Sequence, residues 1–223
     1  MNRSLVLRLV LKDWYLSRAT FAVVAVVGAL SVGSLYLRHG LTSMLGMFAA
    51  LIATIFLGVL LPQQTIVNER KRQNLAFVMS LPVSVSDYTA AKILCNLAGF
   101  LLLWLPIVVG MIGTVASTGT FGGLIPLMVV AALAPFAGFA LLVAVAIVTE
   151  SETWAMTTMA ACNVSYSLVW IFLARVPGLL RDLASPVAVW RPQIVSTIAV
   201  ETGVVVLSFV LTFYLQSKKS DFI

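Results

Sequence analysis

The sequence predicts an all-α integral membrane protein with six transmembrane helices. Of its 223 residues, 61% are hydrophobic and only 10% are charged, whereas a typical soluble domain has about 25% charged residues. The mean hydropathy is +1.07. A bilayer core of about 30 Å takes about 20 helical residues to cross, and the chain contains apolar runs of that length. We therefore expect one transmembrane domain over residues 1–223.

The N-terminal segment, residues 1–18, is predicted to be an amphipathic helix that lies in the membrane interface. Its basic residues alternate with leucines, and on a helix Leu5, Leu9 and Lys12 fall near one face, which is typical of interfacial helices. The alternative is the basic start of a signal peptide whose apolar part is Thr20–Leu37. Removal of that span would leave an odd number of helices.

Six apolar runs give the predicted spans, and the connections between them differ in character. A polar segment follows the second span, and the semi-apolar insert 174–192 precedes the last. The predicted spans are residues 20–37, 41–62, 93–116, 124–149, 155–173 and 194–215.

Basic residues are distributed unevenly between the two sides of this topology, and cytoplasmic loops carry an excess of Lys and Arg. One side holds ten of the fourteen Lys and Arg residues, including all those in the N-terminal segment, the 63–92 loop and the C-terminal tail. The other side holds four, namely Arg38, Arg175, Arg181 and Arg191. The prediction is a multi-pass protein of the cytoplasmic (inner) membrane with both termini in the cytoplasm.

The 63–92 loop has the signals of a folded element. A polar block, residues 68–74, precedes an apolar face at helical spacing. Pro82 disfavours helix at Leu81, so a first helix is expected to end near Ser80. Ser84 and Asp87 then fit a capping box, which predicts a second helix running into the third span. Positive-inside charge alone explains the basic residues but not this order.

The same loop resembles the cytoplasmic signature of ABC-2-type transporter permeases. That signature combines an acid with basic neighbours, a short amphipathic helix, a Leu-Pro break between small residues, and a Lys entering the next span. The residues that carry the resemblance are Glu69-Arg70-Lys71-Arg72, Ser80-Leu81-Pro82-Val83-Ser84, Asp87-Tyr88 and Ala91-Lys92.

The resemblance implies the membrane-spanning subunit of an ATP-binding cassette exporter, with lipids, polysaccharide precursors, peptides, drugs and haem among the possible cargoes. It further implies that the 63–92 loop forms a coupling helix docked on a separate ATPase, which binds ATP and Mg²⁺. Two ATPase copies and a second permease, identical or homologous, would complete the assembly. It also implies short re-entrant outer helices at 174–192. The residues expected to couple are Glu69, Arg70, Lys71, Arg72, Phe77, Leu81 and Pro82.

Polar residues inside the last two predicted spans are candidates for a substrate path or a subunit interface. Glu201 lies about seven residues into the sixth span, where an ionisable group costs about 2.5 kcal/mol or more. It is either a residue of the substrate path or a structural anchor, with Arg175 and Arg191 as candidate partners. The fifth span holds Asn163 and Tyr166 among small polar residues, which favour close helix contacts in lipid.

The remaining classes of function are disfavoured by what the sequence lacks. It has no GxxxxGK[ST], HExxH or GxSxG motif, so intrinsic catalysis is not expected. Cys95 and Cys162 stand alone in apolar runs, so no metal site, bound cofactor or disulfide is predicted. No basic, aromatic-interleaved surface for nucleic acid occurs outside the spans. The alternative function is a channel or scaffold without ATP coupling, which would not need an organised 63–92 loop.

Overall fold

A computed structural model describes residues 3–37, 40–71, 85–118 and 122–218. The described residues are helical apart from short connections and contain no strand. Six helices among the described residues are long and apolar enough to cross a membrane, which confirms the predicted all-helical chain with six candidate spans. The six spanning stretches are residues 10–36, 41–67, 88–117, 122–149, 152–174 and 192–217.

Ten helical elements make up the described chain. The long helices are α1 (Arg3–Tyr36), α2 (Gly40–Pro62), α5 (Val85–Thr118), α6 (Ile125–Thr149), α7 (Glu152–Ala174) and α9 (Pro192–Ser217). The short elements are the π-helix η1 (Gln63–Val67), α3 (Asn68–Lys71), the 3-10 helix η2 (Gly122–Leu124) and α8 (Leu179–Leu183).

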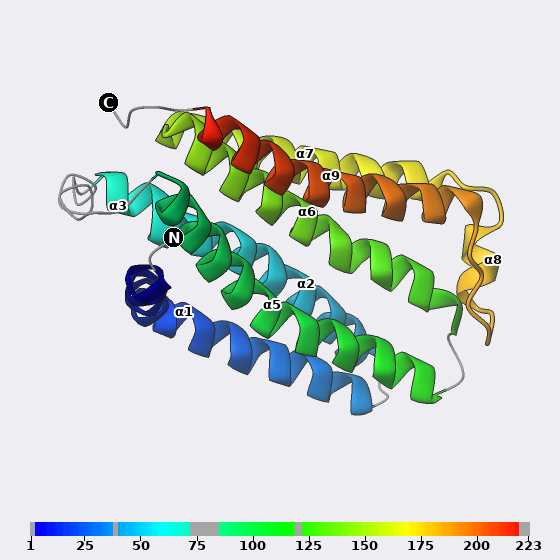
Figure 1. Cartoon of the computed structure of the whole chain (residues 1–223). Helices are drawn as coiled ribbons and strands as arrows, with labels where there is room; N and C mark the ends of the chain where they lie inside the picture. Colours follow the sequence, from blue (N-terminus) through cyan, green and yellow to red (C-terminus); the bar gives the residue numbers. More distant parts are fainter. Residues whose placement is uncertain (1–2, 38–39, 72–84, 119–121, 219–223) are drawn as a thin grey trace.

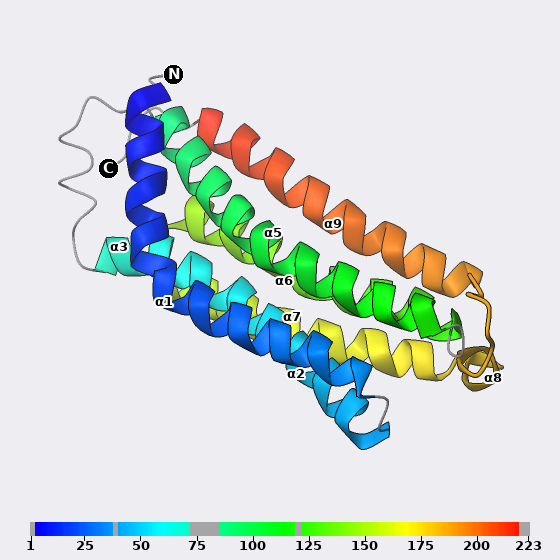
Figure 2. The same cartoon turned by 90° about the horizontal axis from the view of Figure 1, so that it is seen from below.

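The first helix joins the predicted N-terminal segment to the first predicted span. Residues 1–18 were expected as a helix separate from the first span, but α1 runs unbroken from Arg3 to Tyr36. No proline occurs in this stretch and its first glycine is Gly28, so nothing in the sequence breaks the helix between the two parts. The first turns of α1 nevertheless run at an angle to the rest (Figure 2). Their placement in a membrane interface stays a prediction.

The six long helices form two groups of three (Figure 1). Helices α1, α2 and α5 pack together, as do α6, α7 and α9, and α2 against α6 is the main contact between the groups. An aromatic cluster from α5 and α6 joins the groups, with the rings of Phe100 and Phe139 4.4 Å apart. Trp104 Nε1 also donates to the Ala132 carbonyl at 2.9 Å. Gly58 allows α2 to approach α6 closely, because a Cβ at this position would lie 3.2 Å from Phe139 Cβ.

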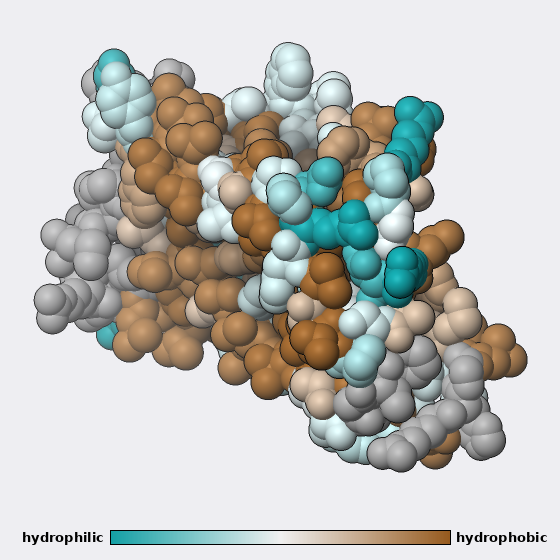
Figure 3. All heavy atoms as spheres, turned by 90° about the vertical axis from the view of Figure 1, so that its right-hand side faces the viewer, coloured by the Kyte–Doolittle hydropathy of each residue, from teal (hydrophilic) through white to brown (hydrophobic). Residues whose placement is uncertain are grey.

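The two ends of the bundle differ. We call the end with α3, the start of α1 and the end of α9 the basal end, and the end with η2 and α8 the distal end (Figure 1). The predicted helices of the 174–192 insert reduce to one short helix, α8. Seen end-on, hydrophilic side chains gather over the α8 segment and hydrophobic surface flanks them (Figure 3).

The α8 segment is fixed to the distal end by backbone contacts and one ion pair. The Gly123 amide donates to the Ser185 carbonyl at 2.9 Å. Arg191 forms an ion pair with Asp182 and donates through Nη1 to the Pro177 carbonyl at 2.8 Å. This hydrogen-bonded ion pair lowers the pKa of Asp182 and raises the pKa of Arg191. Entry of α8 into the membrane stays a prediction.

Candidate functional site

Four charged residues meet at the basal end, and we call them the basal ion cluster: Lys12, Asp13, Glu69 and Lys92. They come from three elements, since Lys12 and Asp13 lie on α1, Glu69 on α3 and Lys92 on α5. Lys92 Nζ lies 2.7 Å from Asp13 Oδ2 and also pairs with Glu69 Oε2. Lys12 pairs with Glu69 Oε1, and its Nζ lies 3.5 Å from Asp13 Oδ1. The cluster therefore links the start of the 63–92 loop to two spanning helices.

Three of the four charged residues of the cluster are buried, and burial of a charge is costly unless the charge is paired. The exposed fractions of Lys92, Asp13 and Glu69 are 0%, 2% and 7%. Buried ions are tolerated only when they are paired and hydrogen-bonded. Here two positive and two negative groups cancel. Three oxygens surround Lys92 Nζ, from Asp13, Glu69 and the Thr65 carbonyl, the last at 2.7 Å, which matches the three donors of an ammonium group.

Hydrogen bonds of Thr65 and Asn96 connect η1 to α5 beside the cluster. Thr65 lies in the π-helix η1, and π turns are common at functional sites. Its hydroxyl donates to the Leu61 carbonyl at 2.8 Å and accepts from Asn96 Nδ2 at 2.9 Å. Asn96 Nδ2 also donates to the Lys92 carbonyl at 2.9 Å. These bonds hold η1 against α5, so the Thr65 carbonyl is fixed where Lys92 needs it.

Electrostatics keep Glu69 ionised. Burial raises the pKa of this carboxyl, but the neighbouring ammonium groups of Lys92 and Lys12 outweigh that effect, and the pKa is lowered overall. Tyr88 lies at the same corner, with its hydroxyl 3.5 Å from Glu69 Oε2 and Lys92 Nζ 5.4 Å from its ring centroid. Glu69 is thus a fixed anion at the head of the loop.

The structure places only part of the predicted coupling set. Glu69 is turned into the ion cluster and is buried, so its carboxylate is already paired within the chain. Arg70 and Lys71 belong to α3, but their side chains lie outside the described residues. Four further residues expected to couple lie outside the described part of the chain, as does the predicted N-cap Ser84. The four are Arg72, Phe77, Leu81 and Pro82.

Sequence reasoning missed the cluster itself. Lys12 was assigned to a face of the predicted interfacial helix and Lys92 to the resemblance, both also counted for topology, but neither was expected to form an ion pair, and Asp13 was given no role. The available signal was the type of residue: Asp13 is the single acid among the bases of the N-terminal segment, and Lys92 adjoins a long apolar run. An acid and a base that both lie at the ends of apolar runs can form an ion pair, but the sequence does not show that Asp13 and Lys92 meet.

Two of the three residues predicted for a substrate path, Asn163 and Tyr166, line the same small cavity of about 50 Å³ between α2, α6 and α7, and Glu201 is not among its lining residues. Glu201 of α9 is only 6% exposed, and neither carboxylate oxygen has a hydrogen-bond partner among the described residues. The expected partner Arg191 pairs with Asp182 instead. Asn163 of α7 is exposed and donates to the Met159 carbonyl at 3.0 Å. Tyr166 of α7 also faces a second, larger cavity.

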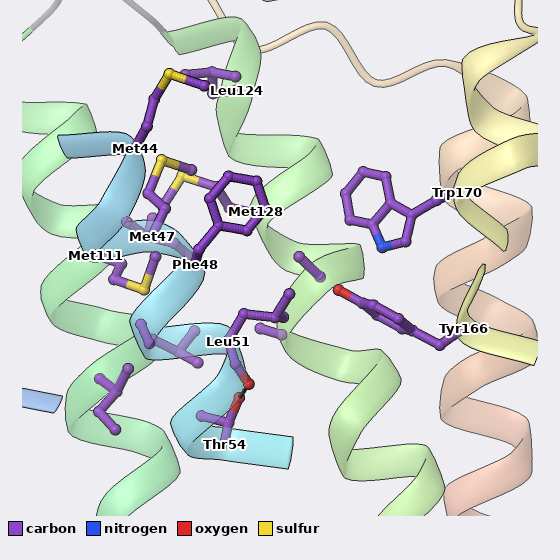
Figure 4. A pocket seen from close by; sticks show the side chains of 16 residues that line it. Met44, Met47, Phe48, Leu51, Thr54, Met111, Leu124, Met128, Tyr166 and Trp170 are labelled. Atoms are coloured by element: carbon purple, nitrogen blue, oxygen red, sulfur yellow. Dashed lines mark hydrogen bonds between the residues drawn. The ribbon is translucent and has the colours of Figure 1, made fainter. Parts of the chain in front are cut away.

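That cavity, which we call the distal cavity, has a volume of about 560 Å³ and lies between the two helix groups. Met44 near the start of α2 and Leu124 before α6 place it in the distal half of the bundle. Tyr166 and Trp170 extend toward it from α7 (Figure 4). Lining residues from α2, α5 and α6 include Met44, Met47, Phe48, Leu51, Met111 and Met128.

The described residues hold no group of three or more His, Cys, Asp or Glu that could bind a metal ion. Comparisons with protein-family models, curated proteins and solved structures returned no match to this chain.

Proposed function

We propose that this chain is the membrane-spanning permease subunit of an ATP-binding cassette exporter, driven by a separate ATPase that docks on the 63–92 loop. The supporting observation is the basal ion cluster. Through Glu69 it joins the head of that loop to α1 and through Lys92 to α5. A movement of the loop would therefore reach α5 through the buried pair of Glu69 with Lys92 and α1 through the half-exposed pair of Glu69 with Lys12.

The proposal assigns different tasks to the two parts of the loop. The buried residue Glu69 anchors the loop, because its carboxylate is saturated by Lys12 and Lys92. The basic residues that follow it, together with Phe77 and the Leu81-Pro82 break, would contact the ATPase. ATP-driven closure of two ATPase copies would move the loops of two paired permeases, and the cluster would convert that movement into tilting of α1 and α5.

The orientation follows from the same assignment. The ATPase, with its ATP and Mg²⁺, is cytoplasmic, so the basal end would face the cytoplasm and the α8 segment the opposite side of the inner membrane. The larger share of Lys and Arg lies on the basal side of the predicted topology, which agrees with positive-inside insertion.

Co-purification tests this function. The tagged chain, extracted from native membranes, is expected to retain an ATPase subunit. Reversal of Arg70, Lys71 and Arg72 to Glu should abolish retention without changing membrane insertion. The matched control reverses Arg175 and Arg181, two exposed bases near the distal end, and should retain the ATPase. Absence of any ATPase from the wild-type preparation, together with ATP-independent flux in liposomes, would favour a channel instead.

A further inference from the structure

The distal cavity has the size and lining of a ligand site. Small-molecule pockets typically occupy about 300–1,000 Å³ and are mostly apolar with a few placed polar groups, and this cavity measures about 560 Å³. Four methionines line it, Met44, Met47, Met111 and Met128. Methionine is unbranched and polarisable, so it adapts to ligands of varied shape. No charged side chain is among its described lining residues, which disfavours an ionic ligand.

The cavity lining is almost entirely apolar, and α7 adds two aromatic rings that each carry one polar group, the Tyr166 hydroxyl and the Trp170 indole N–H. The Tyr166 hydroxyl is buried and has no hydrogen-bond partner among the described residues. The Trp170 ring stands edge-on to that of Tyr166, with centroids 6.1 Å apart and planes at 78°. Both rings extend into the cavity (Figure 4). An unpaired buried hydroxyl costs about 1–3 kcal/mol, and a ligand acceptor would remove that cost.

The chemistry of these two groups defines the polar feature of the ligand. An indole N–H only donates, and a phenol both donates and accepts. A ligand atom that accepts a hydrogen bond is thus the common complement. The opposite wall offers methionine, phenylalanine and leucine side chains from α2 and α5, which complement a hydrocarbon body.

We propose that the distal cavity binds a neutral lipophilic molecule: a hydrocarbon body with one hydrogen-bond acceptor, which the Tyr166 hydroxyl contacts. Binding requires only this chain. If the chain is an exporter subunit, as proposed above, the ligand of this cavity would be the exported compound, and that compound would be lipophilic. This step rests on the proposed function. The same hydrocarbon chemistry has two sources, a free lipophilic solute or the chain of a bilayer phospholipid.

Photolabelling distinguishes the two sources. The wild-type protein in phosphatidylcholine nanodiscs is irradiated with one of two probes, a 16-carbon alcohol or a phosphatidylcholine, each carrying a diazirine in its chain. Peptide mapping then compares cavity residues such as Met111 and Met128 with lipid-facing Leu168, which is 58% exposed. Saturable labelling of the cavity, displaced by unlabelled hexadecanol, is expected with the alcohol. Saturable labelling by phosphatidylcholine alone would assign the site to bilayer lipid.

Two variants and a matched control test the residues. Ala131→Phe places a ring in the cavity and should reduce its labelling at least about fivefold, whereas Ala161→Phe, on the exposed face of α7, should not. Tyr166→Phe should weaken the alcohol's competition about 2- to 10-fold, the value of one hydrogen bond, and leave competition by hexadecane unchanged. The proposal would be overturned if, in the wild-type protein, the cavity residues were labelled no more than Leu168, without saturation, and unlabelled hexadecanol did not reduce that labelling. ATPase co-purification is scored separately, so either claim can fail alone.

Discussion

Replacement of Lys92 by Met is the most informative perturbation of the basal ion cluster. The change keeps an unbranched side chain of similar length and removes the ammonium group that Asp13, Glu69 and the Thr65 carbonyl surround. Among the described side chains, Lys12 would remain as the one cation beside two buried carboxylates, and its Nζ lies 3.5 Å from Asp13 Oδ1. The variant therefore carries an uncompensated negative charge in a buried site.

The expected cost follows from that imbalance. Breaking a buried ion pair by removing one partner costs about 3–5 kcal/mol. For a chain of this size each kcal/mol shifts the melting temperature by about 2–4 °C, so Lys92→Met should lower it by roughly 6–20 °C. Lys92→Met combined with Asp13→Asn restores neutrality, because Lys12 and Glu69 still pair. The double variant should therefore be more stable than Lys92→Met alone.

Tryptophan fluorescence in nanodiscs, recorded during heating, measures these shifts. Arg18→Gln is the control for loss of a positive charge, since Arg18 is exposed and its guanidinium lies over the Tyr15 ring, 4.2 Å from the centroid. It should change stability by about 0.5–1 kcal/mol at most. The reasoning is refuted if Lys92→Met melts within about 3 °C of Arg18→Gln, or if the Asp13→Asn change adds to the loss instead of reversing part of it.

Three further changes test other parts of the structure. The pKa of Glu69 is lowered in the folded protein. The stability that the ionised Glu69 contributes is therefore complete above the unfolded-state pKa of about 4.3 and is lost as pH falls through the folded-state pKa. Between pH 6 and pH 3 the melting temperature of Glu69→Gln should depend less on pH than that of the wild type. A Cβ at Gly123 would lie 1.8 Å from the Asp182 carbonyl oxygen, so Gly123→Ala should cost about 1–3 kcal/mol, whereas Gly33→Ala, with nothing within 4 Å, should not lower the melting temperature. Glu201→Gln should preserve or raise the melting temperature, because it removes a buried carboxylate that has no hydrogen-bond partner in the described part of the chain; a clear fall would mark Glu201 as a structural anchor.

The number and position of the spans could be predicted because bilayer thickness imposes the length of each apolar run. The predicted spans fall on the six long helices, one on each. The interfacial placement of residues 1–18 stays a prediction: α1 is continuous from Arg3 to Tyr36, because no proline or glycine occurs before Gly28, and its first turns run at an angle to the rest (Figure 2). Hydropathy predicts which residues of a helix lie in lipid, whereas proline and glycine favour the positions where a helix ends.

The basal ion cluster could not be predicted because its pairs are far apart in the sequence. The contacts of Lys12 with Glu69 and of Lys92 with Asp13 cross 57 and 79 residues, and they depend on how α1, α3 and α5 meet. The distal cavity was missed for a related reason. Its methionine and aromatic lining has the same hydropathy as lipid-facing residues, so only packing separates the two. The prediction at Tyr166 could name a polar residue but not the cavity that it faces.

Site-specific photocrosslinking tests the central claim, ATPase docking on the 63–92 loop, most directly. A benzoylphenylalanine at Phe77 is compared, in native membranes, with one at Leu41, which is 72% exposed at the start of α2. We expect a crosslink from position 77 to a separate chain that carries the GxxxxGK[ST] motif, and none from position 41. No such chain at position 77, or equal crosslinking from both positions, would contradict this claim.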